Sequence, residues 1–293
     1  MSLIATLIAR PGHLSPSRVT MAARVVKTRA EDWLAGETAC DLLLPDDADS
    51  RETEIELRRL FASDPIDIVV QESANRRKKL LIADMDSTMI GQECIDELAD
   101  AIGIKPEVAA ITARAMNGEI AFEPALRERV RLLKGLPVSM IDKVIRERIT
   151  LASGSRELIA TMKKNGARTA LVSGGFTAFT TRIAAMLGFD ENSANRLIEE
   201  DGRLTGTVAE PILGRRAKAD ALTSITRSLG LSSADAIAVG DGANDLDMIK
   251  LAGTGVALHA KPMVAAEAPI RIDHGDLTGL LYIQGYRQSE FAS

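Results

Sequence analysis

The nine residues LLIADMDST, 80–88, decide the fold of this chain. Their four leading apolar residues, without polar alternation, are typical of a strand buried on both faces of a parallel sheet. Asp84 and Asp86 follow two positions apart, so both carboxylates can face the same side of an extended segment. One carboxylate can then act as a nucleophile while the other transfers protons, and carboxylates are known nucleophiles in phosphoryl transfer. An acidic pair at a strand end also serves as an ordinary turn or helix cap.

The region after residue 79 repeats this arrangement of an apolar run followed by small or polar residues. ARTALV (167–172) precedes SGG, ADAIAVG (234–240) precedes DGAND, and VAL (256–258) is a further short run. Helical patterns such as SRELIATMKK and RAKADALTSITRSLG lie between them. This alternation predicts an α/β fold with a Rossmann-like, doubly wound and mostly parallel sheet.

The strand ends of such a sheet meet at one edge, where ligands bind. The motif GDGAND, 240–245, would bring Asp241, Asn244 and Asp245 to that edge beside Asp84. Clustered carboxylates need a cation, and their hard oxygens suit Mg²⁺. Zinc is disfavoured because His and Cys ligands are not clustered.

Two further features suit an anion at the same edge. Ser173 and Gly174 offer a hydroxyl and backbone N–H groups near a helix start. Lys218 would place a positive charge beside the acidic residues, although a single lysine is more often a solvated surface residue.

Four segments lie outside the sheet pattern. Residues 92–150 contain helical patterns and no convincing strand, which predicts a helical insertion after the first core strand. Residues 195–208 (NRLIEEDGRLTGTV) predict a hairpin turning at Asp201-Gly202. Residues 1–75 alternate strands (3–9, from 40, from 66) with helices (17–27, 54–61), which predicts a small α+β domain. The basic stretch 71–79 reads as a solvated linker.

Composition narrows the class of protein. The hydrophobic fraction of 46% is typical of a globular protein. The formal net charge of −5 disfavours a nucleic-acid partner, because nucleic-acid-binding surfaces usually carry excess Lys and Arg. Cys40 and Cys94 suggest neither a disulfide framework nor a zinc site. The sequence shows neither an apolar run of membrane-spanning length nor a recognisable signal peptide, so a cytoplasmic location without a membrane partner is expected.

DMDST, SGG, Lys218 and GDGAND, in this order, resemble the haloacid dehalogenase superfamily of phosphatases. The stretches ALVSGGF, VGDGANDLDMI and GVALHAKP are similar to its phosphoserine phosphatase family, and the resemblance runs from about residue 79 to the C-terminus. It implies a catalytic core at 79–91 and 151–293 with a helical cap at 92–150. The implied reaction is hydrolysis of O-phospho-L-serine through an aspartyl phosphate, the last step of serine biosynthesis.

The resemblance also implies residue roles. Asp84 matches the nucleophile and Asp86 the general acid/base. Mg²⁺ would be bound by Asp84, the Asp86 backbone carbonyl and Asp241. The expected substrate-binding residues are Glu93 for the ammonium group, Arg129 for the carboxylate, and Ser173, Gly174, Lys218 and Asn244 for the phosphate. Asp245 would support Lys218 or the metal shell.

Residues 1–75 resemble ACT-like domains, a similarity that rests on element order and position. It raises serine binding and a homodimer as hypotheses. Two other activities stay open: a phosphatase or phosphotransferase of the same fold acting on another small ester or acceptor, and an amino-acid-binding regulator with decayed catalysis. The intact Asp84, Asp86, Lys218 and Asp241 argue against decay.

Overall fold

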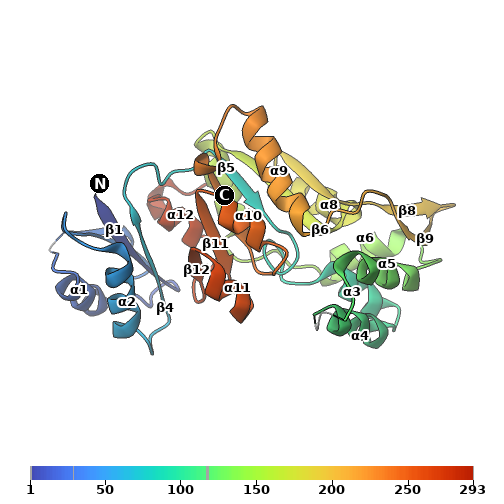
Figure 1. The fold of residues 1–293 in the computed structure, drawn as a ribbon, viewed down its shortest axis with the longest axis horizontal. Coiled ribbons are helices and arrows are strands. Elements are labelled where there is room, and N and C mark those ends of the chain that lie inside the picture. Colours follow the sequence, from blue (N-terminus) through green and yellow to red (C-terminus); the bar gives the residue numbers. More distant parts are fainter. Residues whose placement is uncertain (1, 29, 117–118, 293) are drawn as a thin grey trace.

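The computed structural model describes residues 2–28, 30–116 and 119–292 (Figure 1). Its centre is a six-stranded sheet in the order β12-β11-β10-β5-β6-β7, in which all neighbouring strands are parallel. The strands are β5 (Leu80–Ala83), β6 (Arg168–Phe176), β7 (Glu191–Asn195), β10 (Ala236–Gly240), β11 (Thr254–Leu258) and β12 (Ile270–Ile272). The predicted α/β class with a parallel central sheet is confirmed.

Both faces of this sheet are covered, which explains the unbroken apolar runs. Every residue of β5 and β10 is buried. Leu80 and Ile82 pack on one face with Leu222 and Met248, while Leu81 packs on the other within the main core. The helices of this region are α7 (Ser155–Lys164), α8 (Thr177–Leu187), α9 (Arg215–Ser228), α10 (Leu246–Leu251), α11 (Pro262–Glu267), α12 (Gly279–Ile283) and the short η1 (Ser233–Asp235) and η2 (Gln288–Glu290).

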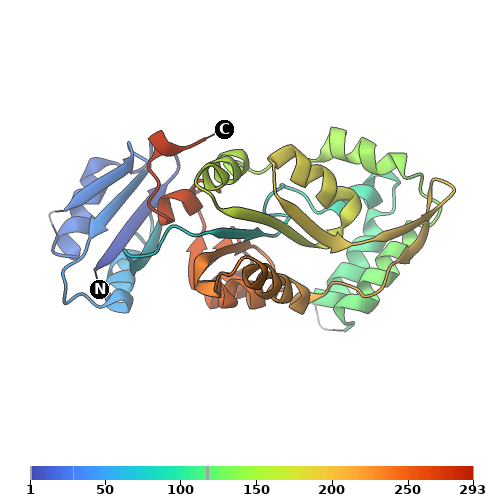
Figure 2. The ribbon, with the colours of Figure 1, turned by 90° about the horizontal axis from the view of Figure 1, so that it is seen from above.

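A group of four helices lies at one end of the molecule (Figures 1 and 2). They are α3 (Cys94–Ala101), α4 (Lys105–Met116), α5 (Phe122–Leu132) and α6 (Ser139–Arg148). The two chain segments that connect this group to the sheet run side by side, because Ile90 bridges Leu151 and the Gly91 N–H donates to the Thr150 carbonyl at 3.0 Å. The helices thus occur where the helical insertion was predicted, and the domain boundaries stay predictions.

A hairpin extends from the sheet over these helices (Figure 2). It consists of β8 (Leu197–Glu200) and β9 (Arg203–Val208), with the positive φ values of Asp201 and Gly202 forming the turn. The N–H of Gly135 donates to the Leu204 carbonyl at 2.7 Å, and the Leu204 N–H donates to the Leu136 carbonyl at 2.9 Å. The hairpin was predicted from its turn residues, whereas its attachment to the helices was not.

The N-terminal region forms a second, antiparallel sheet in the order β2-β3-β1-β4. Its elements are β1 (Leu3–Ala9), α1 (Pro16–Val25), β2 (Glu31–Ala35), β3 (Ala39–Leu43), α2 (Ser50–Leu60) and β4 (Ile66–Glu72). The edge strand β2 was not predicted, because Glu31 and Asp32 are exposed and interrupt the apolar pattern. None of the described helices is long and apolar enough to cross a membrane.

The prediction that residues 71–79 form a solvated linker is wrong in part. Gln71 and Glu72 belong to β4, and the Gln71 amide donates to the Ile283 carbonyl at 2.7 Å. Arg76 is only 18% exposed and pairs with the buried Asp41 at 2.6 Å. A buried carboxylate needs such a partner, so this arginine joins the segment to the N-terminal sheet.

Candidate active site

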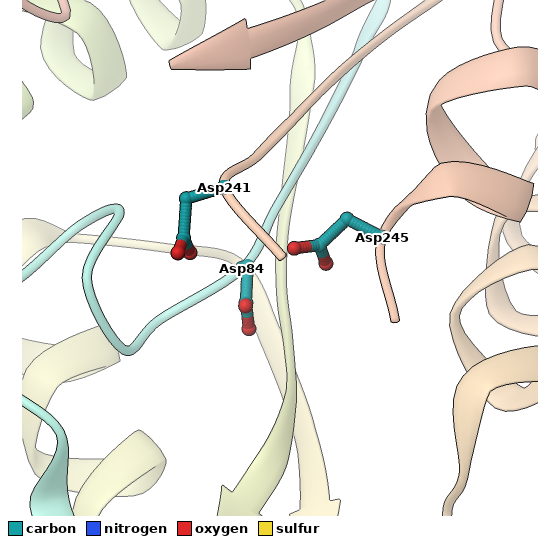
Figure 3. A group of neighbouring side chains, drawn as sticks. All are labelled: Asp84, Asp241 and Asp245. Carbon is teal, nitrogen blue, oxygen red and sulfur yellow. The ribbon is translucent and has the colours of Figure 1, made fainter. Parts of the chain in front are cut away.

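Three carboxylates gather beyond the carboxyl ends of β5 and β10 (Figure 3). Asp84 follows β5, Asp241 follows β10, and Asp245 precedes α10. One oxygen from each lies within 4.8 Å of the others, and all three residues are buried. The parallel sheet brings Asp84 and Asp241 together because β5 and β10 are neighbours in register, with Ala83 opposite Val239. Gly240 leaves the space that Asp245 occupies, since a methyl group there would lie 2.3 Å from its carboxyl carbon.

Lys218 is buried among these carboxylates. Its Nζ lies 2.7 Å from Asp84 Oδ1 and 2.5 Å from Asp245 Oδ1, and its side chain is 3% exposed. Although burial lowers its pKa, the attraction of the two carboxylates raises it overall, so the lysine is charged. Burial, followed by the charge of Asp245, raises the pKa of Asp84 well above its usual range against the opposing attraction of Lys218. The three carboxylates of the cluster thus outnumber the one lysine that pairs with them.

Asp86 lies two residues after Asp84 and is partly buried, with both carboxylate oxygens hydrogen-bonded. Its Oδ1 accepts the Cys94 N–H at 2.9 Å, and its Oδ2 accepts the Ser173 hydroxyl at 3.3 Å. Burial and then the nearby charge of Glu93 raise the pKa of Asp86 to about 6. A carboxyl group with such a pKa can donate and accept a proton near neutral pH, as a general acid/base must.

The sequence suggested that Ser173 and Gly174 follow the strand. They lie instead within the last residues of β6. The pairing of β6 with β7 shifts between Val172 and Phe176, which releases this stretch from a regular ladder. Gly175 must be a glycine, because a methyl group would lie 2.8 Å from Asp86 Oδ2. A methyl group on Gly174 would lie 3.8 Å from Asn244 Nδ2, so the two predicted phosphate-binding residues face one another.

Asp241 completes the cluster on the β10 side. Its Oδ1 accepts the hydroxyl proton of Thr88 at 3.2 Å. Burial, then the charges of Asp245 and Glu93, raise its pKa to about 6. Buried carboxylates that repel one another and present hard oxygens over a few ångströms fit a small divalent cation such as Mg²⁺. Asp84 and Asp241 belong to the predicted ligand set, and Asp245 is the third carboxylate of the cluster.

The helical insertion brings two more predicted residues toward Asp86. Glu93, at the start of α3, is exposed and accepts the Ser87 hydroxyl at 2.8 Å. Arg129 lies on α5. Burial lowers the pKa of its guanidinium, against the opposing attraction of Asp96, Glu93 and Asp86. Its Nε donates to the Ala125 carbonyl at 3.4 Å. Within the described ranges Arg129 makes no ion pair at 4.0 Å or less, so its guanidinium retains donors for a ligand.

Three residues at this site were not singled out from the sequence. Thr88 is the last residue of DMDST, and its position in that motif was a usable signal. Phe122 is the first residue of α5. It would lie 3.5 Å from a methyl group on Gly174, so it covers the end of β6 from the side of the helices. Asn195 is a buried residue of β7, and its carboxamide hydrogen-bonds to backbone groups of Gly174 and Leu213.

Comparison with known proteins identifies the class to which this fold and site belong. The family model of haloacid dehalogenase-like hydrolases matches residues 81–250. A HAD family hydrolase from Salmonella enterica serovar Typhi has a similar solved structure, with a TM-score of 0.87 and 30% identity over 96% of this chain and 98% of that one.

Relatives within the class are more specific. The phosphoserine phosphatase of Archaeoglobus fulgidus is 44% identical over 234 residues, which cover 79% of this chain and 68% of the relative. A solved structure described as a phospho-aspartyl intermediate analogue of phosphoserine phosphatase is 44% identical, with a TM-score of 0.65, and covers 70% of this chain and 98% of that one. This chain belongs to the phosphoserine phosphatase family of haloacid dehalogenase-like hydrolases.

Proposed function

We propose that this protein hydrolyses O-phospho-L-serine to L-serine and phosphate through a phosphoryl group carried on Asp84. The observation that carries the proposal is the pairing of buried Asp84 with Lys218, with Asp86 beside it at a pKa of about 6. A nucleophile, a cation for the transferred oxygens and a proton donor are the groups that phosphoryl transfer to a carboxylate requires.

The steps follow from these positions. An oxygen of Asp84 attacks phosphorus while the Asp86 carboxyl group protonates the departing serine oxygen. Asp86, now a carboxylate, then removes a proton from the water that hydrolyses the aspartyl phosphate. Lys218 donates to the phosphoryl oxygens, and Ser173, Gly174 and Asn244 hold the phosphate in line with Asp84.

The cofactor assigned to the carboxylate cluster is Mg²⁺, held by Asp84, Asp241 and the backbone carbonyl of Asp86, with Asp245 supporting Lys218. When bound, the ion supplies positive charge against the transferring oxygens. The support for this assignment is the surplus of carboxylates over lysine in the cluster and its purely oxygen donor set.

Substrate choice is assigned to Glu93 and Arg129. A phosphorylated amino acid carries an ammonium and a carboxylate besides its phosphate, so it needs one anionic and one cationic partner outside the phosphate site. The charges of Glu93 and Arg129 act on one another and on Asp86, which supports their assignment to a single small substrate. Arg129 can bind the carboxylate with two parallel N–H donors.

The test is phosphate release from L-phosphoserine beside a panel of other small phosphomonoesters, with Mg²⁺ or with a chelator. Asp84→Asn should abolish release from every ester, and retained turnover would refute the nucleophile assignment. Arg129→Ala should reduce kcat/KM for phosphoserine by about 100-fold, the loss of a charge-assisted pair, and for p-nitrophenyl phosphate by far less.

Arg131→Ala is the matched control, because Arg131 lies two residues further along α5 and is exposed. Its kcat/KM should stay at the wild-type value for both esters. Equal losses on the two esters in Arg129→Ala would overturn the substrate role of that residue, while leaving the chemistry of Asp84 in place.

The roles of the remaining regions are proposals too. The antiparallel sheet of residues 3–72 supports an ACT-like domain that binds serine or forms a homodimer, which titration with L-serine and sedimentation of the full chain would test. A cytoplasmic location is consistent with two buried, unpaired cysteines.

A further inference from the structure

Asn195 lies at the last position of β7, and its carboxamide joins two separate parts of the chain. Its Nδ2 donates to the Gly174 carbonyl at 2.9 Å and to the Leu213 carbonyl at 3.3 Å, while its Oδ1 accepts the Leu213 N–H at 2.7 Å. The residue is 2% exposed, and its backbone is registered opposite Phe176. A buried amide with both ends satisfied holds its partners in one arrangement.

The first partner is the C-terminal stretch of β6 that carries Ser173. The Gly174 carbonyl and the Gly175 N–H belong to one peptide plane, so a bond to the carbonyl fixes the direction of the N–H. That N–H donates to Ser173 Oγ at 2.9 Å, and the Ser173 hydroxyl donates to Asp86 at 3.3 Å. Asn195 therefore determines how the Ser173 hydroxyl is presented to the site.

The second partner is the approach to α9. Leu213 immediately precedes Gly214, the residue that caps the N-terminus of this helix, and Lys218 lies in the helix's first turns. Phe122 lies near both Gly174 and Gly214, 3.5 Å and 3.7 Å from the positions where methyl groups would stand. One carboxamide thus ties together the two chain segments that carry the phosphate-binding groups.

We infer that Asn195 is a positioning residue that sets the spacing between the Ser173 stretch of β6 and Lys218, and so the affinity of the site for phosphate. The inference rests on the proposed function of this site. It concerns the phosphate half of the substrate alone, because Glu93 and Arg129 are on elements that Asn195 does not contact. Asn195 acts through these segments and does not touch the reacting atoms.

The experiment compares Asn195→Leu, which keeps the branched side-chain shape without its hydrogen bonds, with Asn192→Leu on the same strand. Asn192 is exposed and accepts the Thr180 hydroxyl at 2.9 Å, and its side chain makes no hydrogen bond to the Ser173 stretch among the described residues. Inhibition constants for inorganic phosphate and L-serine are measured in the full-length protein with Mg²⁺, beside the thermal midpoint.

We expect the phosphate constant of Asn195→Leu to rise about 5- to 30-fold, as for the loss of one or two hydrogen bonds, with the serine constant within twofold. Asn192→Leu should change neither. If Asn195→Leu does not fold, Asn195→Ser, whose hydroxyl reaches fewer partners, should show the same split between the two ligands.

Unchanged constants in both Asn195 variants, or equal weakening of phosphate and serine binding, would overturn the positioning role, because general loosening affects both halves alike. A wild-type protein that neither hydrolyses phosphoserine nor binds phosphate would instead refute the proposed function. The two failures are therefore distinguished by the wild-type measurement alone.

Discussion

Replacing Lys218 by Met tests the electrostatics of the site without involving substrate. Lys218 lies 2.7 Å from Asp84 and 2.5 Å from Asp245, and the three side chains are 3%, 7% and 0% exposed. Methionine fills a similar volume but leaves two buried carboxylates facing each other. Removing one partner of a buried ion pair destabilises a protein by about 3–5 kcal/mol, and we expect a loss in this range.

The assay is urea unfolding followed by circular dichroism at pH 7.5 with a chelator present. Lys250→Met is the control, because Lys250 pairs with Glu267 at the surface, where the two side chains are 47% and 46% exposed. This control should cost less than about 1 kcal/mol. Adding Asp245→Asn to Lys218→Met removes one of the two stranded charges and should recover about 2 kcal/mol.

Two results would refute this reasoning. A loss below about 1 kcal/mol for Lys218→Met would mean that the carboxylates are not stabilised by the lysine. Strictly additive effects of Lys218→Met and Asp245→Asn would mean that the two residues do not interact, despite their separation of 2.5 Å.

Four further outcomes are expected. The pKa of Asp241 is raised to about 6 in the fold, so protons compete with the cation below that pH. The Mg²⁺ affinity measured by calorimetric titration should therefore fall between pH 7.5 and pH 5. A pH-independent affinity would contradict this. The same raised pKa means that the metal-free protein loses stability as pH rises from about 4 through 6, which thermal unfolding with a chelator would show. Arg76→Met should destabilise the N-terminal sheet by about 3 kcal/mol, because it leaves the buried Asp41 without its partner. The double variant Arg76→Met with Asp41→Asn should regain most of this stability. Equal stability of the single and double variants would exclude the ion pair as the cause. Gly255→Ala should impair folding, seen as loss of soluble protein, because its methyl group would lie 1.9 Å from the Ile249 carbonyl oxygen.

The buried strands were predictable because their residues carry one unambiguous signal. LLIA and AIAVG are apolar throughout, since both faces of the sheet are covered, and polar residues begin where each strand ends. The position of Asp84 beside Asp241 then follows from parallel pairing. The strands that were missed, β2, β7 and β12, lie at sheet edges, where polar residues such as Glu31, Ser193 and Arg271 break the apolar pattern.

Contacts that depend on tertiary structure could not be predicted in the same way. The Asn195 carboxamide hydrogen-bonds to backbone groups 18 and 21 residues away. Every residue offers such backbone groups, so the sequence does not reveal which ones are the partners. Arg76 looked like part of a solvated basic run because its partner, Asp41, lies 35 residues earlier, on β3. Local pattern determines which segments are buried, whereas chain topology determines which polar groups meet.

The hairpin of β8 and β9 determines how this protein can be recombined with its relatives. Its turn and strand exchange backbone hydrogen bonds with residues 135–138, which lie far from it in sequence. If helices α3 to α6 were transplanted at their two connecting segments alone, the Gly202 carbonyl and the backbone N–H and carbonyl of Leu204 would face a foreign surface. The unit to exchange is therefore discontinuous, namely residues 92–150 together with 197–208, and chimaeras that carry both segments should fold where those carrying one do not.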